Sequence, residues 1–509
     1  MDCRCHIVFV RDANPPFFVL LGNDEEKMKR AVQRMQNIDS QVLARRLTPY
    51  TFYLVKPFPI DQLRNTIQGF RYSEPIPLER NEKGKEPGIT MILSGQLLSK
   101  DERAVYNRFV WSLADIEPGT VLIGNHCTLR INAMYANLWT EIILDKLKYF
   151  NGFLQMRVRI GTAIFTKYRN SQGDESRLER FKEDLEDRNR EDSQLTSHFS
   201  EELGNERMES SILARFLAAN DIFCAPNTSF FGSFTIPHFH KGPYEYRLEV
   251  ELKANGTDSD IVMQKWYRLE PNESSFTNVM DINFLDLQRP SSSYNLAITR
   301  CHSLLDRDQE QILPGPYRNF ANDIKLNCER ALDPRVAQRF ILFPVSDVNT
   351  NVPKIPIKDM QQKRSWRFTV KDSSYVVEVS AIQNIEFSYS PFKVSAREQR
   401  WAVQLWHPQW DVTLGENSRL GIGDCATWEA KEWCFFPPRG MDEMRDMEGL
   451  AYEKGSGWME LLRVLALVEG VIMGDGLRNL TLELGRVTLR DRKDDAYKDS
   501  EDDGSEKEL

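Results

Sequence analysis

The strictest constraint on the fold is an alternating pattern in residues 244–252. Large apolar residues there alternate with Glu and Arg, so an extended chain would have one apolar face and one charged face. Asn255-Gly256 follows as a tight-turn signal, and a second strand-like stretch returns over residues 261–269. The pattern predicts a β-hairpin with one face on a hydrophobic core, which favours an antiparallel sheet over a helical repeat.

The C-terminal half carries further strand signals. Residues 366–370 and 375–379 flank a short polar turn, and residues 401–406 form another run rich in aromatic and apolar residues. Residues 458–473 are mostly apolar and predict a helix that covers one face of the sheet. We therefore expect residues 151–490 to form a C-terminal antiparallel β-rich domain with a covering helix.

The N-terminal part mixes short strands with one helix. Apolar runs at residues 7–10 and 17–21 predict a hairpin, and Asp24 is placed to cap a helix that ends near Arg46. The apolar residues of that helix recur at helical spacing: Met28, Ala31, Val32, Met35, Ile38 and Val42. Residues 1–56 thus predict a small α/β module.

The length of 509 residues is too great for one compact core, since domains hold roughly 100 to 200 residues. We expect a Pro-rich connector over residues 57–87 and a central α+β unit over residues 88–150. Residues 174–210 are predicted to be a charged insertion that is solvated or disordered, and residues 491–509 a disordered acidic tail. The expected fold class is α+β.

The net charge of −9 argues against a nucleic-acid partner only until its distribution is considered. Residues 174–210 contain 13 acids and 6 bases, and residues 491–509 contain 9 acids and 4 bases. These two segments carry −12 together, so the remainder of the chain is at +3. Residues 1–71 hold 11 bases against 7 acids, which permits contact with RNA.

The candidate RNA-binding residues lie on the N-terminal helix and just after it: Lys27, Lys29, Arg30, Arg34, Arg45 and Arg46. We expect them to contact single-stranded RNA, with an ordinary solvated surface as the alternative. None of the 27 glycines lies three positions from another, so the GxxG loop that clamps RNA in KH domains is absent.

One cluster could hold a transition metal. His238 and His240 would point the same way on a strand, and Glu245 could complete a set of three ligands. The spacing resembles the first motif of cupin metalloenzymes, but the second motif is missing, and surface histidines are the alternative. Hydrolase, NTPase and dinucleotide-binding motifs are absent, so no catalytic residue and no other cofactor is expected.

The compartment follows from what the sequence lacks. It has no apolar run of about 18 residues, which predicts no membrane partner. It has no secretory signal, and its eight cysteines are widely scattered, which favours a reducing compartment. We expect a cytoplasmic or nuclear protein whose acidic segments could bind protein partners.

Several stretches resemble fungal KH-domain proteins with a large uncharacterised C-terminal domain, the meiotically up-regulated KH-protein type. The similar stretches are residues 27–47, 156–162 and 401–405, then Trp410, Asp411, Asn417, Leu420, Gly423, Trp428 and residues 435–437. The resemblance implies that residues 1–56 are a partial, degenerate KH-like module, and it implies RNA binding.

Together these patterns predict an RNA-binding or ribonucleoprotein-associated protein without catalytic activity. Two alternatives stay open. One is a cupin-like metal-dependent enzyme that uses His238, His240 and Glu245, and the other is an interaction scaffold.

Overall fold

The structure is a computed structural model. It describes residues 6–10, 17–21, 24–47, 50–55, 70–72, 91–93, 121–123, 140–166, 175–176, 196–201, 206–237, 244–269, 276–285, 293–301, 305, 310, 313–332, 338–347, 352–389, 392–397, 399–437 and 456–474. The predicted tail 491–509 and all but residues 70–72 of the predicted connector 57–87 lie outside these residues.

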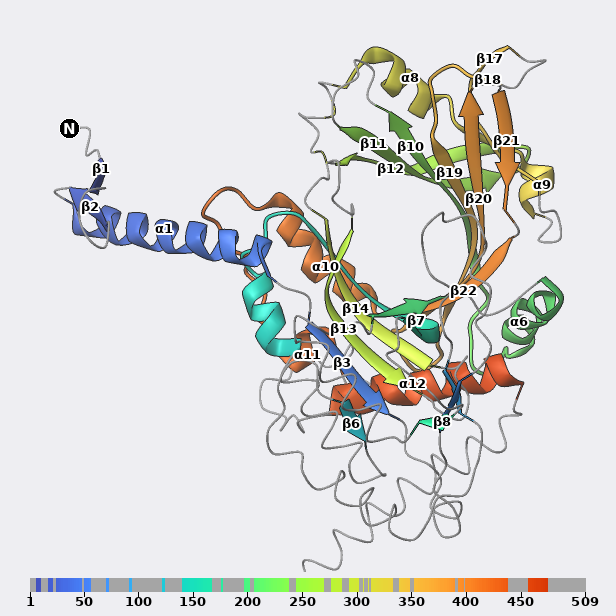
Figure 1. The fold of residues 1–509 in the computed structure, drawn as a ribbon, viewed down its shortest axis with the longest axis horizontal. Coiled ribbons are helices and arrows are strands. Elements are labelled where there is room, and N and C mark those ends of the chain that lie inside the picture. The colour runs from blue at the N-terminus through green and yellow to red at the C-terminus, as the bar shows by residue number, and fades with distance from the viewer. Residues whose placement is uncertain are drawn as a thin grey trace, which may run out of the picture.

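A 13-stranded sheet organises the described part of the chain (Figure 1). Its strands, in spatial order, are β12 (Asp258–Leu269), β11 (Glu245–Asn255), β10 (Asn227–Pro237), β19 (Asp359–Thr369), β20 (Val376–Tyr389), β22 (Arg400–Trp406), β7 (Phe153–Thr166), β14 (Ser293–Cys301), β13 (Thr277–Leu285), β3 (Tyr50–Val55) and β6 (Val121–Ile123). Two further strands join off this path: β21 (Phe392–Ala396) beside β20 and β9 (Thr196–Ser200) beside β7. All pairs are antiparallel except those of β3, which runs parallel to β13 and β6.

Short strands and helices complete the fold. The small sheets are β1 (His6–Val10) with β2 (Phe17–Leu21); β5 (Met91–Leu93), β4 (Phe70–Tyr72) and β8 (Glu175–Ser176); β15 (Lys325–Leu326) with β16 (Ile341–Leu342); and β17 (Val345–Asp347) with β18 (Val352–Pro353). The helices are α1 (Glu25–Arg45), residues 140–147, α6 (Glu206–Ala218), α8 (Gly315–Asn322), α9 (Cys328–Leu332), α10 (Pro408–Gly415), the 3-10 helix η3 (Glu416–Arg419), α11 (Glu432–Phe435) and α12 (Ser456–Met473). In this part of the chain, none is long and apolar enough to span a membrane.

The predicted α+β class with a large antiparallel sheet is confirmed. The alternating pattern forms the hairpin β11–β12, in which Leu248, Val250 and Leu252 are fully buried. Gly256 makes the turn in the left-handed region, at φ 62°, as its sequence predicted. The strands expected near residues 366–379 and 401–406 are β19, β20 and β22, and the expected apolar helix is α12.

One face of the sheet is apolar and packs on helices. The strand registers align Leu248, Phe234, Met360 and Ile385 in one row across β11, β10, β19 and β20. This row is part of a core that α8 and α9 cover. A second core lies over the middle of the sheet and includes residues of α6, α10, α12 and the helix at 140–147. Burial of these side chains is the main favourable term that holds the layers together.

The sheet joins strands from three of the predicted segments. β3 lies in the predicted module 1–56 and β6 in the predicted unit 88–150, yet both continue the C-terminal sheet beyond β13. The expectation that residues 174–210 stay outside the packed fold is wrong at β9, which pairs with β7 along its whole length. Backbone hydrogen bonds to an existing strand offset the polar composition there. The KH-like character of residues 1–56 stays a prediction.

Asn417 joins distant segments beneath the sheet. Its side chain is fully buried, and its Nδ2 donates to the carbonyl oxygens of Leu147 and Phe150, each at 2.8 Å. Its Oδ1 accepts from Trp428 Nε1 at 3.0 Å, and its own carbonyl accepts from the Gly152 amide at 3.1 Å. The side-chain amide of Asn417 thus provides hydrogen-bond donors to the carbonyls at the end of the helix at 140–147. Its backbone carbonyl fixes where β7 begins.

We predict that Asn417→Ala lowers the free energy of unfolding by about 2–3 kcal/mol, because two buried carbonyls and an indole N–H lose their partner. Chemical denaturation monitored by tryptophan fluorescence measures this. Ser418→Ala is the control, since it removes an exposed hydrogen bond to Gly415 one residue away. Equal losses in the two variants would show that Asn417 is not a structural hub.

Candidate functional site

The six predicted cations lie at the edge of the molecule, on α1 and its C-cap (Figure 1). Asp24 caps the helix as predicted, since its carboxylate accepts a hydrogen bond from the Lys27 amide at 3.1 Å. Lys27, Lys29, Arg30, Arg34, Arg45 and Arg46 are all exposed. The structure therefore leaves the whole set accessible to solvent.

These cations differ in their contacts. Lys27 lies 3.7 Å from Asp24 and Lys29 lies 2.9 Å from Glu25, both as exposed ion pairs that contribute little to stability. Arg34 donates from Nε and a terminal nitrogen to the Ile422 carbonyl at 3.2 and 3.0 Å. Among the residues that the structure describes, no ion pair occupies Arg30, Arg45 or Arg46. These three are the cations most open to an anionic ligand.

The helix is held mainly by polar side chains, with Ala44 as its buried apolar residue. Asn37 Nδ2 donates to the Gly423 carbonyl at 3.0 Å. Gln41 donates to the carbonyls of Gly421 and Asp424 and accepts from the Gly423 amide at 3.0 Å. Asn37 and Gln41 are buried by this contact. The loop 421–424 is thus the docking point of α1.

Gly423 fits this contact in two ways. Its φ is +80°, a left-handed conformation that other residues adopt only at a cost. A Cβ there would lie 2.5 Å from Arg34 Cγ and 3.1 Å from the Arg34 carbonyl oxygen. Only glycine lets the loop approach the helix backbone this closely.

We predict that Gly423→Ala loosens α1 and raises the hydrogen-exchange rates of its amides. Gly256→Ala is a matched control, because Gly256 is also left-handed but a Cβ there would meet no atom within 4 Å. The two variants share the backbone cost of about 1–2 kcal/mol and differ in the clash with Arg34. Unchanged exchange in α1 for Gly423→Ala would contradict the docking role.

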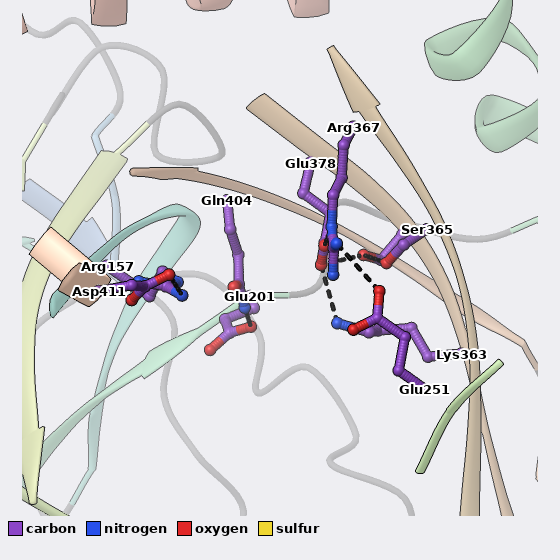
Figure 2. A network of polar contacts seen from close by, with 10 residues as sticks. Arg157, Glu201, Glu251, Lys363, Ser365, Arg367, Glu378, Gln404 and Asp411 are labelled. Carbon is purple, nitrogen blue, oxygen red and sulfur yellow. Dashed lines mark hydrogen bonds and ion pairs between the residues drawn. The ribbon is translucent and has the colours of Figure 1, made fainter. Parts of the chain in front are cut away.

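A row of polar side chains crosses the other face of the sheet. The registers align Arg367, Glu378, Gln404, Arg159 and Asn295 across β19, β20, β22, β7 and β14. Figure 2 shows much of this row with its neighbours, with side chains from β11, β19 and β20 pointing toward one another. No sequence motif marks these residues as a site. The alternation of polar and apolar residues along each strand is visible in the sequence. The partners of the polar side chains are defined only by the register of the strands.

Glu378 is the centre of this network. Its carboxylate accepts from Lys363 Nζ at 2.8 Å, Arg367 Nε at 3.0 Å and Ser380 Oγ at 3.0 Å. Arg367 also donates to Glu251 at 3.0 Å. Burial acts to raise the pKa of Glu378, but Lys363 and Arg367 outweigh it and lower the pKa from 4.5 to about 2.

Aromatic rings lie between the cations. Lys363 Nζ is 4.4 Å and Arg367 Cζ is 5.0 Å from the centroid of the Phe231 ring. The Trp406 ring lies 5.9 Å from Arg367 and 4.8 Å from Arg157. Such cation–π contacts hold the long side chains in place on the sheet.

Each of these cations has a carboxylate partner. Besides the pairs around Glu378, Arg159 lies 3.0 Å from Glu201, and Arg157 binds Asp411 of α10 through two bonds of 2.8 Å. The network therefore has no net positive charge to attract an anion. Its geometry supports a structural role, in which paired charges fix how strands and α10 meet.

We predict that Glu378→Gln lowers the free energy of unfolding by about 2–3 kcal/mol at pH 7, because Lys363 and Arg367 lose a charged acceptor. The folded pKa lies below the unfolded value, so this contribution is present above pH 4.5 and is lost as the pH falls toward about 2. Denaturation from pH 7 downward should show the two proteins converging across that window. A difference that is independent of pH would contradict the assigned pKa.

The alternative metal site remains a prediction. His238 and His240 lie outside the described residues, and the carboxylate of Glu245 binds Lys358 Nζ at 3.0 and 3.2 Å. Within the described ranges, no group of three or more His, Cys, Asp or Glu side chains is placed to hold a metal ion.

The fold and these contacts define an α+β protein with a charge-paired sheet face and a cationic helix. The chain belongs to the family described as Domain of unknown function (DUF7905), whose model matches residues 139–441, more than half of the sequence. No curated protein sequence matches the chain.

Two solved structures are similar to the chain at low scores. They are described as the structure of the S. pombe Pct1 RNA triphosphatase and as that of the same enzyme in complex with the Spt5 CTD. The first has a TM-score of 0.29 and 8% identity, covering 64% of this chain and 91% of its own. The second has a TM-score of 0.29 and 7% identity, with coverage of 66% and 93%. We draw no argument about activity from this likeness.

Proposed function

We propose that the protein binds single-stranded RNA through the exposed cations of α1, without a catalytic step. The observation that carries the proposal is the exposure of Lys27, Lys29, Arg30, Arg34, Arg45 and Arg46 on one projecting helix and its C-cap in an acidic protein. The sheet cations do not support the same role, since carboxylates neutralise them.

The spacing of the cations suits an extended polyanion. At about 1.5 Å per residue, Lys27 and Arg45 lie about 27 Å apart along the helix axis. Lys27, Arg30 and Arg34 are separated by three and four residues and so lie on one side of α1. Phosphates of one strand could follow this side, with binding that is electrostatic, tolerant of sequence and strongly salt-dependent.

Without a GxxG loop, no backbone clamp reinforces these contacts. The interaction should therefore be weak, and its free energy should come mainly from counterion release. Because Arg34 is hydrogen-bonded to the Ile422 carbonyl, it is less available to bind a phosphate than Arg30, Arg45 and Arg46 are.

We predict that replacing Lys27, Arg30, Arg45 and Arg46 together by Ala weakens binding of a fluorescent single-stranded RNA. Each cation that contacts a phosphate should contribute about 0.7 to the slope of log affinity against log salt. Fluorescence anisotropy at several salt concentrations measures both quantities. The slope for the variant should be shallower than that of the unmodified protein.

The matched control changes the same net charge elsewhere. Lys253, Lys325, Lys354 and Lys393 are exposed and lie far from α1 in the sequence. Their joint replacement by Ala should alter binding less than the α1 variant does. Equal losses would indicate a nonspecific charge effect, and no binding by the unmodified protein at low salt would refute the proposal.

A further inference from the structure

The apolar side of α1 is not used by its docking contact. Val32, Ile38 and Val42 are 40%, 38% and 43% exposed, while Met28, Ala31 and Met35 are half-buried. Asn37 and Ala44 of the docking side lie on a different side of the helix, and Arg34 and Gln41 lie at the border of the apolar side. Met35 and Asn37 are two positions apart, which places them about 160° apart around the helix axis.

The exposed stripe has the spacing of a coiled-coil seam. Met28, Ala31, Met35, Ile38 and Val42 are separated by three, four, three and four residues. This alternation averages 3.5 residues and keeps one narrow face directed at a partner helix. A second helix with the same seam fits it directly.

We propose that α1 pairs with α1 of a second copy of this chain, in parallel, through this seam. Charge selects the orientation. With Met28, Met35 and Val42 at the first heptad position, Arg34 lies on one flank of the seam. Asp39, five residues later, lies on the opposite flank. Parallel pairing places Arg34 of each copy beside Asp39 of the other.

An antiparallel pair centred on Met35 would bring the two Arg34 side chains together, which disfavours it. The bonds from Arg34 to Ile422 are compatible with the parallel pair, because a guanidinium has five N–H donors and these bonds use two of its nitrogens. The inference goes beyond RNA binding and does not require it, although both involve Arg34. Its consequence is a symmetric dimer that presents two cationic helices side by side.

Sedimentation velocity of the full chain over about a hundredfold range of concentration tests the pairing. We expect a species of twice 59.2 kDa that dissociates on dilution. Met35→Asp combined with Ile38→Asp should abolish it, because charge enters the seam. Gln36→Asp is the control, since it adds a charge to the same helix away from the seam.

The orientation has its own test. In a parallel pair the two Val42 side chains meet, so Val42→Cys should form a disulfide-linked dimer on mild oxidation. In an antiparallel pair Val42 lies opposite Met28 instead. Val262→Cys, at a 60% exposed position on β12, controls for random crosslinking, as does the unmodified protein with its exposed Cys224 and Cys425.

A protein that stays monomeric at every concentration would overturn the proposal. So would a dimer that survives Met35→Asp with Ile38→Asp in a chain whose circular dichroism is unchanged. A dimer that depends on the seam but gives no crosslink through Val42→Cys would overturn the parallel orientation.

Discussion

The register of the large sheet is the constraint on which the rest of the structure depends. Because side chains alternate along each strand, one alignment places Leu248, Phe234 and Met360 in an apolar row and leaves Arg367 and Glu378 on the opposite face. A shift by one residue would expose the core and bury unpaired charges. The ion pairs of the charged face also penalise such a shift, since Glu378 is buried and would lose both cations.

An amphipathic helix usually buries its apolar side, whereas α1 docks mainly through polar side chains. Its amides are buried against loop 421–424 because that loop offers several backbone carbonyls and one N–H that need partners. Hydrogen bonds of this kind specify position closely but bury little apolar surface. The apolar stripe is consequently left at the surface, where it can pack on another helix.

The main elements could be predicted from periodicity and turn chemistry. The hairpin β11–β12 followed from alternation and Asn255-Gly256, and α1 from its capping residue Asp24 and apolar spacing. Long-range partners could not be predicted. Nothing local indicates that β3 would pair with β13, more than 200 positions away, or that Glu378 would accept a hydrogen bond from Lys363. The α1 cations were identifiable by charge, whereas the docking role of Gln41 had no signal beyond a polar residue in a helix.

The contrast between the two groups of cations decides where a polyanion can bind. Arg157, Arg159, Lys363 and Arg367 would have to give up carboxylate partners in partly buried positions before they could hold a phosphate. Cations on α1 are already hydrated and exposed, so a phosphate displaces only counterions and surface ion pairs. The sheet is therefore the less favourable surface even though it carries four cations and adds aromatic rings. The proposal of RNA binding on α1 rests on this difference in desolvation rather than on the number of basic residues.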